Sequence, residues 1–176
     1  MDLDEIRQEI NLVDNQMKEL FLKRMELAYQ VAENKKRTQK AVYVPKREEE
    51  VLAACIKGVS EEYQLECKTF FGELMEISRA YQYSKLTEES EKRNMLLDGE
   101  GRALLEFTCT QGERHFRAIL LAVLSSGLTA EEVFTEKKEC GYCCRLRVSG
   151  DFSSKRAKAA VLQILEETEH VLIREI

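Results

Sequence analysis

The sequence predicts a chain in two parts, an all-α N-terminal domain of three helices and an α+β C-terminal domain. Three observations indicate this division. Apolar residues recur at helical spacing for about 30 residues near the start of the chain, and the chain has a single proline, Pro45, a residue that breaks helices. After the polar segment 89–101, the spacing changes to short apolar runs that are typical of strands. We therefore place the helical domain at 1–88, a linker at 89–101 and the second domain at 102–176.

The first predicted helix, from residue 3 to about residue 36, carries an apolar seam in which spacings of three and four residues alternate. The seam consists of Leu3, Ile6, Ile10, Val13, Met17, Leu20, Leu27 and Val31. Such a helix is roughly 45 Å long, which is more than a compact domain of this size needs. We expect the helix to find its partner on another chain, so that the three helices form an intertwined homodimer.

Arg24 breaks this seam, because it stands at a heptad position where the pattern calls for an apolar side chain. A buried guanidinium needs a partner, and the periodicity leaves open a structural salt bridge, a shift of register or a bound anion. Lys35 lies eleven residues further on and only about 20° away around the helix. Arg24 and Lys35 therefore stand at the two ends of one stripe, which could line an anion pocket.

The segment KKRTQKAVYVPKR, residues 35–47, holds six positive charges and no negative one in a chain whose net charge is −5. Its middle should be an extended connection, because a residue before proline avoids the helical conformation. Pro45 suits the first turn of a second helix, which carries Arg47 and Glu48 and is expected to continue through residues 51–59, with Gly58 loosening or ending it. The segment is either a solvated loop or a cage for a small polyanion.

A third helix is predicted from about residue 61 to residue 86. Ser78 and Gln82 are four residues apart in it and so share one face. Taken alone, this pair could be ordinary polar surface.

The C-terminal domain is predicted to alternate strands and helices in the order βαββαβ, which is the order of a ferredoxin-like sandwich. In this fold, four antiparallel strands carry two helices on one face. We place the strands at 102–110, 131–139, 143–150 and 170–176, and the helices at 113–127 and 153–169.

Composition and charge exclude several classes of function. Nucleic acid is a poor partner, because both halves of the chain are net acidic. No apolar run approaches the roughly 20 residues that span a bilayer, and the acidic start lacks the features of a targeting peptide, so we expect no membrane association and a cytoplasmic location. The six cysteines are expected to be reduced thiols. The pair Cys140 and Cys143 lacks the second cluster that a structural zinc site needs, and we expect no metal.

Three segments together resemble the all-helical chorismate mutases of the AroQ type. These are LDEIRQEINLVDNQMKELFLKRMELAYQVAENK, VYVPKREEEVL and EISRAYQ, which occur in the order and with the spacing of that family over residues 1 to about 85. The resemblance implies three helices per chain interlocked in a dimer with two active sites. It also implies the substrate, chorismate, and the reaction, an intramolecular rearrangement to prephenate in aromatic amino-acid biosynthesis that needs no cofactor.

The resemblance also implies roles for seven residues, of which Arg24, Lys35 and Gln82 would be catalytic. Lys35 and Gln82 match the pair that hydrogen-bonds the substrate's ether oxygen. The other matches are Arg24 and Arg47 as carboxylate-binding arginines, Glu48 as the partner of the ring hydroxyl, Ser78 as a polar contact beside a carboxylate, and Arg7 as the arginine that enters the partner chain's site. One position departs from the family, since Val44 stands where an aspartate is common.

The C-terminal domain resembles ACT-type regulatory domains in its topology alone, which implies an aromatic amino-acid effector. Gly112 is either an ordinary turn glycine, which the sequence favours, or a place where a ligand approaches the backbone, as in such domains. Two other functions stay open. One is isochorismate pyruvate-lyase activity, and the other is a non-catalytic regulator of a partner enzyme of the shikimate pathway. Because every residue assigned to chemistry precedes residue 83, the sequence predicts that the helical half carries the activity by itself.

Overall fold

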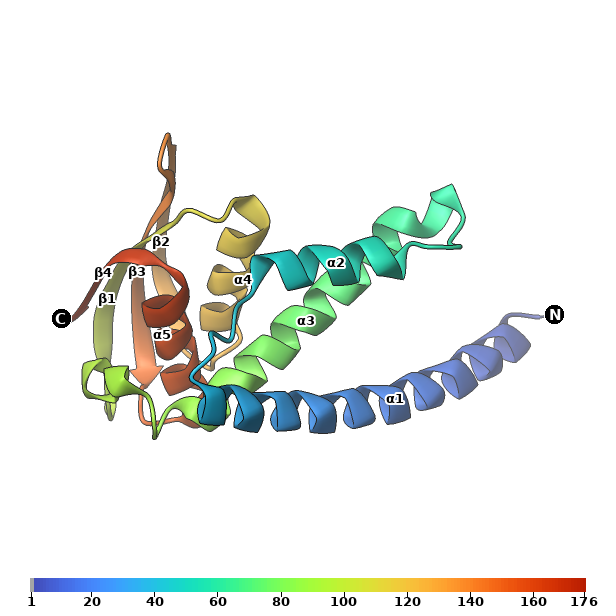
Figure 1. Ribbon diagram of the computed structural model, residues 1–176, viewed down its shortest axis with the longest axis horizontal. Helices are drawn as coiled ribbons and strands as arrows, with labels where there is room; N and C mark the ends of the chain where they lie inside the picture. Colours follow the sequence, from blue (N-terminus) through green and yellow to red (C-terminus); the bar gives the residue numbers. More distant parts are fainter. Residues whose placement is uncertain (1) are drawn as a thin grey trace.

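The computed structural model describes residues 2–176 and shows a helical part followed by a sheet covered by two helices (Figure 1). The helical part consists of α1 (Leu3–Thr38), α2 (Pro45–Cys55) and α3 (Gln64–Leu86), with a short 3₁₀ helix, Glu61–Tyr63, before α3. Asp2 and Glu5 form a capping box at the start of α1, and Gln39 ends this helix in the left-handed conformation. The predicted three-helix domain is thus confirmed.

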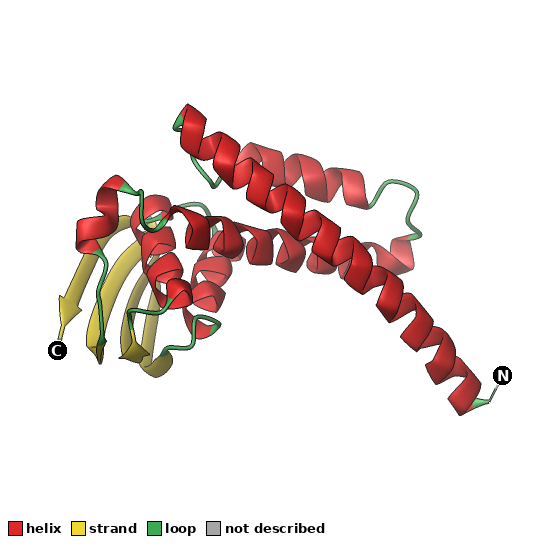
Figure 2. Ribbon diagram, turned by 90° about the horizontal axis from the view of Figure 1, so that it is seen from below, coloured by secondary structure: helices red, strands yellow, loops and turns green. Residues whose placement is uncertain are grey.

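The N-terminal end of α1 projects well beyond the rest of the molecule (Figures 1 and 2). Ala28 and Ala32 are the only buried residues of α1 among those described, and their small side chains let α1 approach α3. The predicted seam is exposed in the single chain, with Leu3 60% and Leu20 67% accessible to solvent. An exposed apolar stripe of this length has no partner within the described part of the chain.

The second helix is shorter than predicted, because α2 ends at Cys55 instead of continuing through residue 59. The chain leaves the helix through turn hydrogen bonds from Lys57 to Ala54 and from Val59 to Ile56. Gly58 has a φ of +78°, a conformation that glycine adopts without strain. The helix therefore ends three residues before Gly58, the residue that the sequence predicted would loosen or end it.

The C-terminal part has the predicted βαββαβ order. Its strands form one antiparallel sheet in the order β2-β3-β1-β4, and helices α4 and α5 lie on one face of it (Figure 2). A 3₁₀ helix, Glu91–Met95, occupies the middle of the predicted linker. The elements are β1 (Glu100–Cys109), α4 (Glu113–Leu124), β2 (Thr129–Lys138), β3 (Gly141–Asp151), α5 (Lys155–Glu167) and β4 (Glu169–Glu175).

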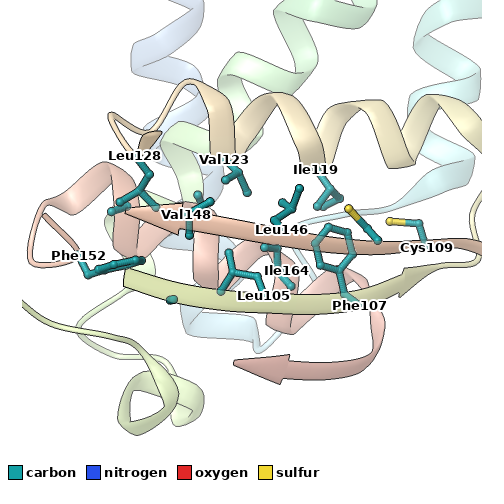
Figure 3. Close-up of a cluster of buried hydrophobic side chains, with 14 of the residues drawn as sticks. Leu105, Phe107, Cys109, Ile119, Val123, Leu128, Leu146, Val148, Phe152 and Ile164 are labelled. Carbon is teal, nitrogen blue, oxygen red and sulfur yellow. The ribbon is translucent and has the colours of Figure 1, made fainter. Parts of the chain in front are cut away.

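The main core lies between the sheet and its two helices (Figure 3). Alternate residues of β1 and β3, among them Leu105 and Leu146, point into it and meet Ile119 of α4 and Ile164 of α5. Burial raises the pKa of the Cys144 thiol to about 12, so this cysteine acts as a small apolar side chain. All six cysteines are free thiols.

A second apolar cluster joins the two parts of the chain. Tyr83 near the end of α3 is 2% exposed and packs with Ala159 and Leu162 of α5, and Val42 and Leu86 pack against this cluster. The C-terminal end of α3 is therefore buried by the second domain. None of the helices in residues 2–176 has the length and apolarity needed to cross a membrane.

Candidate active site

Arg24 and Ser78 meet where α1 packs on α3. Nη1 of Arg24 donates to the carbonyl oxygen of Leu74 at 3.0 Å and also to Oγ of Ser78. Ser78 is itself buried and donates to the same carbonyl oxygen at 2.8 Å. Burial lowers the pKa of Arg24, but a guanidinium remains charged at neutral pH. The side chain that broke the apolar seam is thus a half-buried cation with two oxygen acceptors on α3.

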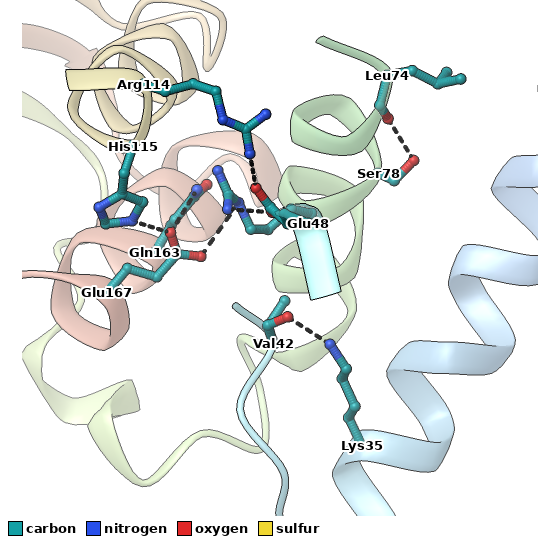
Figure 4. A network of polar contacts seen from close by, with 10 residues as sticks. Lys35, Val42, Glu48, Leu74, Ser78, Arg114, His115, Gln163 and Glu167 are labelled. Carbon is teal, nitrogen blue, oxygen red and sulfur yellow. Dashed lines mark hydrogen bonds and ion pairs between the residues drawn. The ribbon is translucent and has the colours of Figure 1, made fainter. Parts of the chain in front are cut away.

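Lys35 lies further along α1, next to the connection that leads into α2. Its Nζ donates to the carbonyl oxygen of Val42 at 2.5 Å (Figure 4). Burial lowers the pKa of Lys35, and the carboxylates of Glu167 and Glu48 act in the opposite direction. Lys35 is therefore a partly desolvated ammonium group in a region that also holds two carboxylates.

Glu48 lies at the start of α2, is buried and accepts from two arginines (Figure 4). Nη1 of Arg79 on α3 donates to Oε1 of Glu48 at 2.7 Å, and Nη2 of Arg114 on α4 donates to Oε2. Each carboxylate oxygen keeps a further lone pair. Glu48 could therefore accept a hydrogen bond from a ligand while both arginines hold it.

Gln82 lies one helical turn after Ser78 on α3 and is only 9% exposed. Its Oε1 atom is buried and has no hydrogen-bond partner among residues 2–176. A buried amide oxygen without a partner costs free energy. Such an atom is typical of a site where a ligand or water supplies the missing contact.

Two of the seven predicted residues lie apart from these contacts. Arg7 is on the projecting end of α1, where it is exposed and pairs with Asp4 at 3.3 Å. Arg47 is 71% exposed and pairs with Glu50 at 3.4 Å. Val44, at the departure from the family pattern, precedes α2 without any side-chain capping bond. Within residues 2–176 of the single chain, the side chains of Arg7 and Arg47 therefore form no hydrogen bond or ion pair with the other five predicted residues.

Two hollows in the described part of the chain lie elsewhere. One of about 490 Å³ lies between α2, α3 and α4 and is lined by Leu52, Gly72 and Leu124 among others. Another of about 400 Å³ lies between α1, α3, α4 and α5. None of the seven predicted residues lines either hollow. Within residues 2–176, no group of three or more metal-ligating side chains is close enough to hold an ion.

The sequence did not predict a set of charged residues that surround Glu48. Arg79 is 3% exposed and lies within 3.5 Å of Glu167 as well as next to Glu48. His115 is 2.9 Å from Glu167 and stacks on Tyr43 with ring centroids 4.3 Å apart. Arg79 follows Ser78 directly in α3, so its place in the sequence is a local signal for a charge beside the site. The partners from α4 and α5 give no such signal, because nothing in the sequence places them beside α3.

Comparison with known protein families assigns the helical half. Residues 6–83 match the model of the family described as chorismate mutase type II. The match spans 78 of the 176 residues of the chain. It covers nearly all of α1, all of α2 and nearly all of α3, so it contains each of the seven predicted residues. No match was found among curated proteins.

The match indicates an isomerase of the chorismate mutase class. The matched region consists of three helices, as the resemblance implied. The C-terminal half lies outside the match, and its four-stranded antiparallel sheet with two helices is compatible with an ACT-like domain.

Proposed function

We propose that the protein converts chorismate to prephenate at a site formed by α1, α2 and α3. The observation that carries this proposal is the arrangement of buried polar groups between these helices. Arg24 and Lys35 present cations from one face of α1, and Gln82 presents a buried amide from α3, whose NH2 group would be the donor. The family match supplies the substrate class.

The rearrangement breaks an ether bond and forms a carbon–carbon bond within one molecule, so it needs neither a nucleophile nor a cofactor. The protein has to hold two carboxylates in place and to donate hydrogen bonds to the ether oxygen as its charge builds. The fork of Arg24 suits a carboxylate, and the ammonium of Lys35 and the amide of Gln82 suit the ether oxygen. Glu48 would accept from the ring hydroxyl.

We also propose that the active form is a homodimer in which the exposed seams of two α1 helices pack together. A monomer would leave large apolar side chains, such as Leu3 and Leu20, in water along most of α1. Dimerisation would bring Arg7 of one chain near Arg24 and Lys35 of the other. This arrangement supplies the arginine that the single-chain site lacks.

The C-terminal domain is proposed to bind an aromatic amino acid as an effector. Gly112 precedes α4 with a φ of +88°, and a Cβ atom built there would meet no atom within 4 Å. The space beside this backbone is therefore free for a ligand. Phenylalanine, tyrosine or tryptophan should then raise the melting temperature of the protein, and no shift with any of the three would refute the proposal.

The mutase reaction is tested by incubating the protein with chorismate in buffer that contains EDTA. Chorismate should lose its ultraviolet absorbance, and proton NMR should show prephenate as the product. Release of pyruvate from isochorismate, without reaction of chorismate, would favour the lyase alternative. No reaction of either compound by a folded dimer would favour a non-catalytic regulator. The variant Lys35→Met, which keeps the length of the side chain but removes the charge, should be inactive in the same assay.

A further inference from the structure

The contacts around Glu48 extend from the helical domain deep into the C-terminal domain. Four ionisable side chains in this network are almost completely buried, with exposed side-chain fractions of 4% for Arg79, 12% for Glu48, and 1% each for His115 and Glu167. Burying charges is expensive unless they are paired. Such a cluster is an unusual way to join two domains that could pack through apolar side chains alone.

Arg79 lies between two carboxylates that belong to different domains. It donates to Glu48 of α2 at 2.7 Å, and its Nε lies 3.5 Å from Oε1 of Glu167 in α5. Its guanidinium carbon also lies 4.6 Å from the centre of the Tyr43 ring. The position of Arg79, and with it the position of the Glu48 carboxylate, therefore depends on a residue of the C-terminal domain.

Arg114 reaches Glu48 directly from α4 (Figure 4). It passes α3 at Gly72, where a Cβ atom would lie 3.3 Å from Nη1 of Arg114. Glycine inside a helix costs roughly 0.5–1 kcal/mol relative to alanine. At Gly72 it leaves room for the arginine of the second domain.

A second branch of the network leads to Lys35. His115 of α4 bonds with Glu167 and stacks on Tyr43, and the neighbour of Tyr43 is Val42, whose carbonyl oxygen accepts from Lys35. Among the charged groups that affect the pKa of Lys35, Glu167 has the largest effect and raises it. The C-terminal domain thus contacts the immediate surroundings of both Glu48 and Lys35.

We propose that the C-terminal domain is a structural part of the mutase site. Arg114 is a positioning residue for Glu48, while Glu167 and His115 position Arg79 and the Val42–Tyr43 connection. This inference rests on the proposed function, because it assigns Glu48 to the ring hydroxyl of chorismate. It explains why the network is buried and charged, and it means that the helical half does not carry full activity by itself.

The variant Arg114→Gln tests the direct contact, because its partly exposed side chain can be changed without opening the core. Its kcat/KM for chorismate should fall about tenfold, as expected for losing a charged contact to a substrate-binding group. Arg114→Lys should restore part of the activity. Arg117→Gln on the same helix is the matched control and should keep wild-type activity, since no contact of Arg117 reaches the site.

A chorismate analogue without the ring hydroxyl distinguishes positioning from a general loss of structure. If Arg114 acts through Glu48, the ratio of wild-type to Arg114→Gln kcat/KM should be about ten with chorismate and near one with the analogue. Equal ratios with both substrates, or an unaffected variant, would overturn this inference while leaving the mutase assignment intact. A wild-type protein that does not turn over chorismate would overturn the proposed function and this inference together.

Glu167→Gln tests the indirect branch, with Glu166→Gln as the surface control. Glu166 is paired with Lys92 at 3.5 Å and is 39% exposed, so its loss should change neither activity nor stability. Glu167→Gln should lower kcat/KM at least tenfold at a temperature where circular dichroism shows it to be fully folded. If Glu167→Gln does not fold, His115→Phe, which can still stack on Tyr43, replaces it. Wild-type activity in whichever variant folds would overturn this branch.

Discussion

Replacing Arg24 with alanine tests whether this arginine is catalytic or structural. A catalytic role predicts a large loss of activity with a small loss of stability, and a structural role predicts the reverse. In the structure, Arg24 donates to the carbonyl oxygen of Leu74 and to Oγ of Ser78. That carbonyl oxygen also accepts from Ser78 Oγ at 2.8 Å. No buried acceptor is therefore left without a partner when Arg24 is removed.

The expected magnitudes follow from these contacts. A hydrogen bond of this kind contributes about 1 kcal/mol net to stability, so Arg24→Ala should lower the free energy of unfolding by about 1–2 kcal/mol. A donor that stabilises charge in the transition state contributes about 3 kcal/mol or more, which corresponds to a loss in kcat of at least about a hundredfold. The activity of Arg24→Lys should lie between that of the wild type and that of Arg24→Ala, since lysine keeps the charge but loses the planar fork of donors.

The assay compares initial rates of chorismate loss with urea unfolding for Arg24→Ala, Arg24→Lys and the neighbouring control Lys23→Ala. The control should match the wild type in both measurements, because Lys23 is exposed on α1. An Arg24→Ala protein that is several kcal/mol less stable but within a fewfold of wild-type activity would show that Arg24 serves the fold alone.

Three further changes test other parts of the structure. Gln82→Glu should shift the pH–rate profile towards acid, because a carboxyl group can donate to the ether oxygen only when protonated, and a profile equal to that of the wild type would contradict this role. Burial and the neighbouring Glu73 raise the pKa of Glu76 to about 7, so its charge costs stability as pH rises from about 4.5 through 7. Such a pKa shift would correspond to about 3 kcal/mol for a fully buried group, and the partial exposure of Glu76 reduces this. Glu76→Gln should therefore stabilise the protein against urea by about 1 kcal/mol at pH 8 and have no effect near pH 4. Equal effects on stability at both pH values would refute this. Leu20→Glu should give an inactive monomer in analytical ultracentrifugation while Lys18→Glu stays dimeric, and a dimeric Leu20→Glu protein would rule out the seam as the interface.

Local patterns in the sequence predicted most of the fold. The helix of α1 follows from a regular apolar spacing without glycine or proline, and the βαββαβ order follows from short apolar runs that end at turn residues such as Gly127. Gly58 was expected to loosen or end the second helix, and α2 ends three residues earlier, at Cys55, before this glycine takes a left-handed conformation. These features depend on neighbours a few residues apart, which the sequence shows.

The surroundings of Glu48 could not be predicted in the same way. Glu48 matches the family motif, but its partner Arg114 lies 66 residues further along the chain, and Glu167, which contacts its other partner Arg79, lies 119 residues further. Their approach depends on how the two domains pack. Arg47 and Arg7 are both exposed in a single chain, and their proposed roles depend on a second copy of the chain.

Mixing two inactive variants is the most direct test of the proposed composite site. Arg7→Ala and Lys35→Ala should each have little activity as homodimers, because each removes one residue from both sites. After unfolding and refolding together in equal amounts, half of the dimers should contain one chain of each kind, and in these dimers one of the two sites has both residues. The mixture should therefore recover about a quarter of the wild-type rate of chorismate conversion. A mixture no more active than the two parents combined, or an Arg7→Ala protein with wild-type activity, would contradict a site shared between two chains.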